Sequence, residues 1–198
     1  MAGMDHLTTA TVTGSSTSKI SITVSSYTDY HDLLILGTVS QHGTDAGIRD
    51  LYMDFNDLDG TANTSGYVYI YHYRNSSGSG VNLAASDNTG RRPWASSDDW
   101  WMGEMNTVST AGTAPGNYGQ TPIRCFIPSF RQGEQKRGVI AWSAAMQDNS
   151  SSSGSNSITR LHGSKKIEEL DSIQFKTGST SYYFKAGSTI SVYGYNKS

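Results

Sequence analysis

Apolar and polar side chains alternate through Lys19-Ile20-Ser21-Ile22-Thr23-Val24-Ser25. Successive side chains of an extended strand point to opposite faces, so Ile20, Ile22 and Val24 share one face. Strands of antiparallel sheets commonly pack one face on a core and turn the other toward solvent. This stretch therefore predicts one strand of an antiparallel sheet.

Short segments of strand length recur along the rest of the chain. The segment 32–39 is almost continuously apolar, which is typical of a central strand covered on both faces. Helical periodicity is nearly absent, because the one window of helical composition, 163–170, is too short for a helix of normal length. Further strands are expected at 51–56, 66–73, 100–105, 122–130, 139–146, 172–176, 182–184 and 188–195.

Composition points to the same fold class. Hydrophobic residues make up 35% and charged residues 16% of the 198 residues, while twelve tyrosines and five phenylalanines supply large apolar surfaces. We therefore expect an all-β protein, an antiparallel β-sandwich that is jelly-roll-like and has long Ser/Gly-rich loops. The length fits a single domain over residues 1–198. Within it, residues 1–15 are expected to form an N-terminal arm and residues 75–100 a long loop or insertion.

Charge and cysteine content exclude several classes of partner. The formal net charge is −2 and no basic stripe is present, which disfavours binding to nucleic acid. The single cysteine, Cys125, excludes an internal disulfide, and its place in a strand pattern predicts a buried, inert thiol. The first residues have no basic region followed by an apolar one, and no apolar run approaches the ~20 residues of a membrane span. We expect folding in a cytoplasm and no membrane partner.

A search for catalytic and cofactor motifs yields no candidate residues. Nucleophile-elbow, zinc-protease, phosphate-loop and paired-cysteine motifs are absent, and the five histidines show no ligand spacing. Ser, His and Asp all occur, but in a serine-rich chain that coincidence has almost no weight. The segment Asp57-Leu58-Asp59-Gly60 fits only part of a calcium loop, so a tight turn and a calcium site near Asp57 and Asp59 both stay open. We expect no catalytic residue, no cofactor and no metal.

Aromatic residues form the most informative local feature. Trp94, Trp100 and Trp101 follow the serine- and glycine-rich stretch, and adjacent residues of a strand face opposite ways. At most one of Trp100 and Trp101 can therefore lie in the core of a two-layer structure. Core packing, an anchor in a subunit interface and a sugar-stacking platform are the three alternatives. Tyr69 and Tyr71 belong to a row of alternating tyrosines on one side of a strand. Two interpretations of this row stay open, an inner face of the sandwich and an intersubunit face.

Four segments of the chain resemble a group of small structural proteins of tailed bacteriophages. Tyr30-His31-Asp32-Leu33-Leu34-Ile35-Leu36-Gly37-Thr38-Val39-Ser40 and the later Leu51-Tyr52-Met53-Asp54-Phe55-Asn56 are similar to that group's "YDHLLLRGSARS" and "LRFNGD". Ile127-Pro128-Ser129-Phe130 is similar to its central "IPSY". Tyr183-Phe184-Lys185-Ala186-Gly187-Ser188-Thr189-Ile190-Ser191-Val192-Tyr193-Gly194 resembles its closing "NFAAGSTISLYG". The matches keep one order along the chain, although the insert holding 94–101 has no counterpart.

The resemblance implies a component of the virion, assembled in the host cytoplasm, without catalytic residues. Similar proteins occur as head decorations, appendage knobs and tail or baseplate parts. A capsid-surface decoration or knob is favoured, because no coiled-coil or fibrous segment is present. The implied partners are other virion proteins, either the major capsid protein or tail proteins, and a homotrimer or other cyclic homo-oligomer is expected.

Two other functions remain as alternatives. A tail or baseplate adhesin would recognise a host-surface glycan through Trp94, Trp100 or Trp101. An enzyme, in the form of a depolymerase fragment, would need carboxylates that face one another across a cleft. The adjacent pairs Asp98-Asp99 and Glu168-Glu169 cannot supply this arrangement alone, since neighbours on a strand point to opposite faces.

Overall fold

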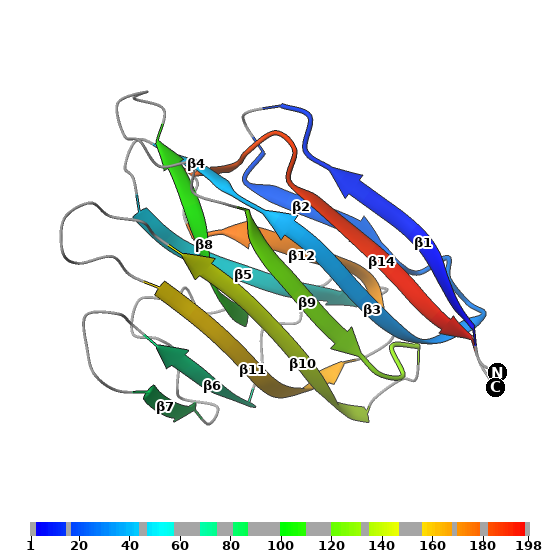
Figure 1. Cartoon of the computed structure of the whole chain (residues 1–198). Helices are drawn as coiled ribbons and strands as arrows, with labels where there is room; N and C mark the ends of the chain where they lie inside the picture. Colours follow the sequence, from blue (N-terminus) through cyan, green and yellow to red (C-terminus); the bar gives the residue numbers. More distant parts are fainter. Residues whose placement is uncertain are drawn as a thin grey trace.

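The chain folds into two β-sheets that pack face to face (Figure 1). The computed structural model describes residues 3–14, 17–43, 47–57, 68–74, 81–86, 100–109, 120–131, 135–146, 156–167, 170–178 and 182–196. Every regular element in these ranges is a β-strand. The expected all-β sandwich is therefore confirmed.

The larger sheet has eight strands in the order β1-β14-β3-β9-β10-β11-β6-β7. Its described pairings are all antiparallel. The strands are β1 (Met4–Thr11), β3 (Tyr30–Val39), β6 (Val68–Arg74), β7 (Val81–Ser86), β9 (Thr121–Ile127), β10 (Gln135–Met146), β11 (Asn156–Ile167) and β14 (Thr189–Asn196).

The smaller sheet has six strands in the order β13-β4-β8-β5-β12-β2. Its described pairings are antiparallel except for that of β4 with β8, which is parallel. The strands are β2 (Lys19–Thr23), β4 (Gln41–Gly43), β5 (Gly47–Asp57), β8 (Trp100–Ser109), β12 (Leu170–Thr177) and β13 (Tyr183–Phe184).

The pairing of the strands is that of a jelly roll. β1 pairs with β14 and β3 with β9 in the larger sheet, while β2 pairs with β12 and β5 with β8 in the smaller one. These four pairs are nested along the chain, so that the outermost segments join each other. Among these eight strands, successive ones alternate between the sheets except for the innermost pair, β5 and β8, which lie together in the smaller sheet. The remaining strands β10, β11, β6 and β7 extend the larger sheet beyond β9.

The core lies between the sheets and is built by the alternating residues of both. The alternating stretch 19–25 packs as predicted, with Ile20, Ile22 and Val24 all buried. The largest fully buried side chains come from both layers: Phe55, Phe130, Phe175, Phe184, Leu33, Ile35, Leu51, Met53 and Met102. Cys125 lies in the same core, where burial raises the pKa of its thiol. The predicted buried cysteine is thus confirmed.

Two segments differ from their expected form. The N-terminal arm expected over residues 1–15 is, over Met4–Thr11, the edge strand β1 paired with β14. The side chains of β1 are mostly polar and show no apolar alternation, so a pattern of side chains does not predict this strand. Its backbone nevertheless pairs with β14. The long loop or insertion expected over 75–100 contains strand β7 and ends where β8 begins.

Candidate functional site

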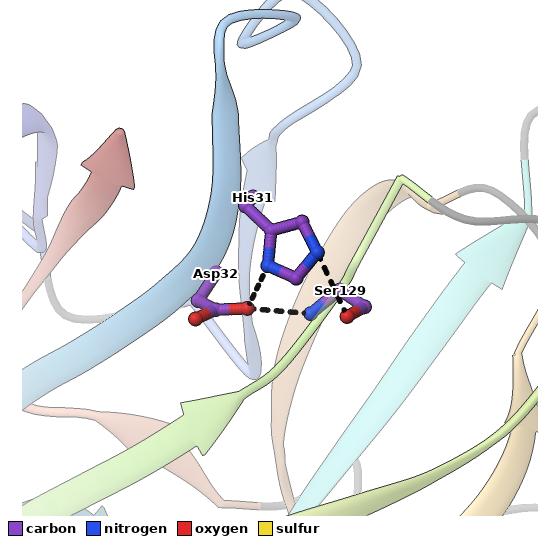
Figure 2. A network of polar contacts seen from close by, with 3 residues as sticks. All are labelled: His31, Asp32 and Ser129. Carbon is purple, nitrogen blue, oxygen red and sulfur yellow. Dashed lines mark hydrogen bonds and ion pairs between the residues drawn. The ribbon is translucent and has the colours of Figure 1, made fainter. Parts of the chain in front are cut away.

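A polar network of three residues joins the start of β3 to the turn that follows β9 (Figure 2). His31 Nδ1 lies 2.6 Å from Asp32 Oδ1, and the backbone N–H of Ser129 donates to the same oxygen at 2.8 Å. Ser129 Oγ lies 3.2 Å from His31 Nε2. The three residues thus form a closed ring of contacts across nearly a hundred positions of sequence, which we call the β3–β9 clamp.

The hydrogen-bond directions in the clamp depend on the tautomer of His31, which the Asp32 carboxylate selects. An ionised carboxylate can only accept, so His31 Nδ1 donates to Asp32. In the neutral imidazole the other ring nitrogen, Nε2, is then an acceptor, and it receives the hydroxyl hydrogen of Ser129. The Asp32 carboxylate therefore orients His31, and His31 in turn orients Ser129.

Ser129 holds a backbone conformation that L-residues rarely adopt. Its φ angle is +50°, and it is the only non-glycine residue with positive φ in the described part of the chain. The left-handed region costs an ordinary residue about 1–2 kcal/mol. Hydrogen bonds on both sides hold the turn in place, since Ser129 N–H donates to Asp32 and Phe130 N–H donates to the carbonyl of His31 at 3.1 Å.

In the clamp the serine hydroxyl contacts the histidine and the histidine contacts the aspartate, as in a serine–histidine–aspartate catalytic triad. This similarity raises the question of catalysis. Acyl transfer also needs N–H groups directed at the oxyanion, typically from the nucleophile and its neighbour. The N–H groups of Ser129 and Phe130 already donate to Asp32 and His31. The arrangement is therefore suited to fastening the turn rather than to stabilising an oxyanion at Ser129.

A second polar cluster fastens the two ends of the described chain. Tyr30 Oη donates to Asp5 Oδ2 at 3.1 Å, and Asn196 Nδ2 donates to the same oxygen at 3.3 Å. Desolvation, followed by the hydrogen bond to Asp5 and its charge, raises the pKa of Tyr30. The Tyr30 ring packs against Gly194, where an added Cβ would lie 2.4 Å from Tyr30 Cδ1.

The outward side of the larger sheet carries apolar side chains. Tyr193 of β14, Leu34 of β3, Phe126 of β9 and Ile140 of β10 are paired in register and form one row across four neighbouring strands. Leu34 is only 6% exposed although it points away from the core, because Tyr193 and Phe126 flank it. We call the surface formed by this row together with Leu36 and Tyr195 the outer apolar face.

Aromatic contacts stiffen the outer apolar face. The rings of His6 and Tyr193 meet edge to face with centroids 5.3 Å apart, and those of Phe126 and Tyr195 do so at 6.2 Å. Edge-to-face pairs at these separations are favourable beyond the area that they bury. The sequence did not identify this face, because a continuous apolar run such as 32–39 does not show which of its residues point outward.

None of the residues that the sequence singled out belongs to the clamp. Trp100 and Trp101 begin β8 and pair with Met53 and Tyr52 respectively, while Tyr69 and Tyr71 lie in β6. The side chains of these four residues lie outside what the structure describes, and Trp94 lies outside it altogether. The three alternatives for the tryptophans and the two interpretations of the tyrosine row therefore stay predictions.

The described ranges contain neither a metal-binding cluster nor a membrane-spanning helix. No group of three or more His, Cys, Asp or Glu side chains that could hold a metal ion occurs among these residues. Asp59 and the side chain of Asp57, where a calcium site stayed open, lie outside the described residues. Within the described ranges there is also no helix long and apolar enough to cross a membrane.

Comparisons with known proteins add no family to this picture. The chain matches no protein-family model. A comparison with curated proteins likewise finds no match.

Proposed function

We propose that this chain is a non-enzymatic structural subunit of a tailed-phage particle, a capsid-surface decoration or appendage knob held by protein–protein contacts. The observation that carries the proposal is the outer apolar face. An outward sheet face is ordinarily polar, and a cluster of apolar side chains there is typical of a surface that another protein covers. The major capsid protein, a tail protein or further copies of the chain are the proposed partners.

The placement of the phage-like segments also supports the proposal. They fall on β3, β5, the end of β9 with the turn that follows it, and the β13–β14 region, which belong to the jelly roll and its edge. The strands added beyond β9 carry none of them. Jelly rolls recur in viral capsid proteins, which makes the fold compatible with the proposal, although fold alone does not determine function.

The absence of enzymatic activity is part of the proposal and has its own test. The clamp should not react with an active-site-directed fluorophosphonate, because no free N–H of Ser129 or Phe130 would stabilise the oxyanion. Labelling of the wild-type chain that Ser129→Ala abolishes would overturn the non-enzymatic assignment. A His31→Ala variant that also stops labelling would identify the clamp as the reacting group.

Location in the intact particle is the decisive test of the structural role. Electron cryomicroscopy of particles with and without the chain should show density on the capsid surface or on an appendage. Ile140→Asp, on the outer apolar face, should reduce incorporation, whereas Ser21→Asp, exposed on the other sheet, should not. Normal particles that fail to adsorb after Trp100→Ala or Trp101→Ala would instead support the glycan-binding adhesin.

A further inference from the structure

We infer that the outer apolar face binds the same face of a second copy of this chain, through a two-fold axis that runs along the row from Tyr193 to Ile140. The inference concerns the purified chain and does not require the particle role proposed above. Failure of one therefore leaves the other standing.

The first support is where exposed apolar side chains lie. Among the described residues the large hydrophobics that are clearly exposed are Met4 at 48% and Ile140 at 42%. Ile140 is the β10 member of the row, and Met4 pairs with Tyr195, so both lie on the outward side of the larger sheet. Figure 1 looks onto this side, and no described segment crosses it.

The second support is the arrangement of charge around the row. Arg124 of β9 pairs with Leu36, two residues beyond Leu34, and Asp32 lies two residues before Leu34. The two charges are thus on opposite sides of the row, separated along the strands by roughly four residues or about 13 Å. Asp32 of β3 and Arg124 of β9 lie on neighbouring strands and on the same outward face of the larger sheet.

This arrangement makes the face complementary to itself. A two-fold axis along the row reverses the strand direction of the second copy and leaves the row facing its own equivalent. Arg124 of each copy then lies over the level of Asp32 in the other copy. Stacked sheets are about 10 Å apart, a separation that an arginine and an aspartate side chain can bridge together. Such an interface is isologous, as expected for two-fold dimers.

The size of the face sets the strength of association. Five strands from β1 to β10 span about 24 Å at ~4.8 Å each, and five residues along a strand span about 17 Å. The described face therefore amounts to roughly 400 Å² per copy, which is below that of a standard stable interface. Association should be weak and concentration-dependent in the isolated chain.

Sedimentation velocity over a wide concentration range tests the inference directly. The wild-type chain should form a reversible dimer, and both Ile140→Asp and Arg124→Glu should raise its dissociation constant at least tenfold. Ser21→Asp, exposed on the smaller sheet, is the matched control and should leave the dissociation constant unchanged. A wild-type chain that stays monomeric at every concentration, or an Ile140→Asp dimer as strong as the wild type, would overturn the inference.

The position of the axis has a separate test. In a dimer with this axis Ile140 faces Ile140 of the second copy. Ile140→Cys should therefore be joined to itself by a short bis-maleimide, whereas Ser21→Cys should not. The native Cys125 does not interfere, because it is fully buried. Equal crosslinking of the two variants would refute the axis, and a larger ring in place of a dimer would refute the two-fold arrangement.

Discussion

Replacing Asp32 by alanine tests the central claim that the β3–β9 clamp fastens the turn after β9. The substitution removes the acceptor of Ser129 N–H at 2.8 Å and the partner of His31 Nδ1 at 2.6 Å. Both interactions are partly buried. In the variant, water therefore replaces the lost acceptor of each N–H group only in part.

The expected cost follows from these two interactions. A hydrogen bond to a charged group contributes about 1.5–3 kcal/mol, and that of Ser129 N–H belongs to this class. The pair with His31 is more exposed, with side-chain exposures of 39% and 26%, so it adds roughly 0–1 kcal/mol. Asp32→Ala should thus lose about 2.5 kcal/mol of unfolding free energy, which lowers Tm by roughly 5–10 °C for a chain of this length.

Urea unfolding followed by tryptophan fluorescence measures this loss. Asp29→Ala is the matched control, because Asp29 is exposed in the preceding turn and should change the unfolding free energy by less than about 0.5 kcal/mol. The reasoning is refuted if the two variants differ by less than about 1 kcal/mol.

Three further measurements probe the same corner of the molecule. Ser129→Gly should be about 1 kcal/mol more stable than Ser129→Ala, since both lack Oγ and only glycine tolerates φ of +50° freely; equal urea midpoints would contradict this. The pKa of Tyr30 is raised in the folded chain, so the fold favours the neutral phenol. The resulting contribution to the free energy of unfolding is present below pH ~10 and is lost as pH rises through the folded pKa. The stability advantage of the wild type over Tyr30→Phe should accordingly shrink in alkali, and a constant difference from pH 8 to 11 would count against it. Gly194→Ala should cost about 1–3 kcal/mol by forcing the Tyr30 ring aside, whereas Gly14→Ala, with no atom within 4 Å of its added Cβ, should not; similar melting temperatures would show that the ring moves freely.

Much of the fold can be predicted from the sequence because alternation is a local signal. The stretch 19–25 and the apolar segment 32–39 each predict a strand from their own residues, and the structure has β2 over Lys19–Thr23 and β3 over Tyr30–Val39. β1 escapes prediction because its polar side chains carry no alternating pattern. The nesting of the strand pairs is equally invisible, since no local pattern specifies a partner more than a hundred residues away.

The clamp and the outer apolar face could not be predicted for the same physical reason. His31 and Ser129 meet only after β3 and β9 pair, and serine is too common in this chain for Ser129 to stand out. Which residues of the apolar run 32–39 point outward depends on the face of β3 that packs on the second sheet. The tryptophans that the sequence favoured remain a prediction, because their side chains lie outside what the structure describes.

The nested pairing of the strands has a consequence for how the chain folds. β1 must wait for β14, its partner at the opposite end of the chain, before the edge of the larger sheet can form. Contacts between such distant segments slow folding, because a large loop must close before they form. During synthesis this edge can therefore be completed only after β14 has left the ribosome, and until then β1 and the edge of β3 that β14 covers are both open to premature aggregation.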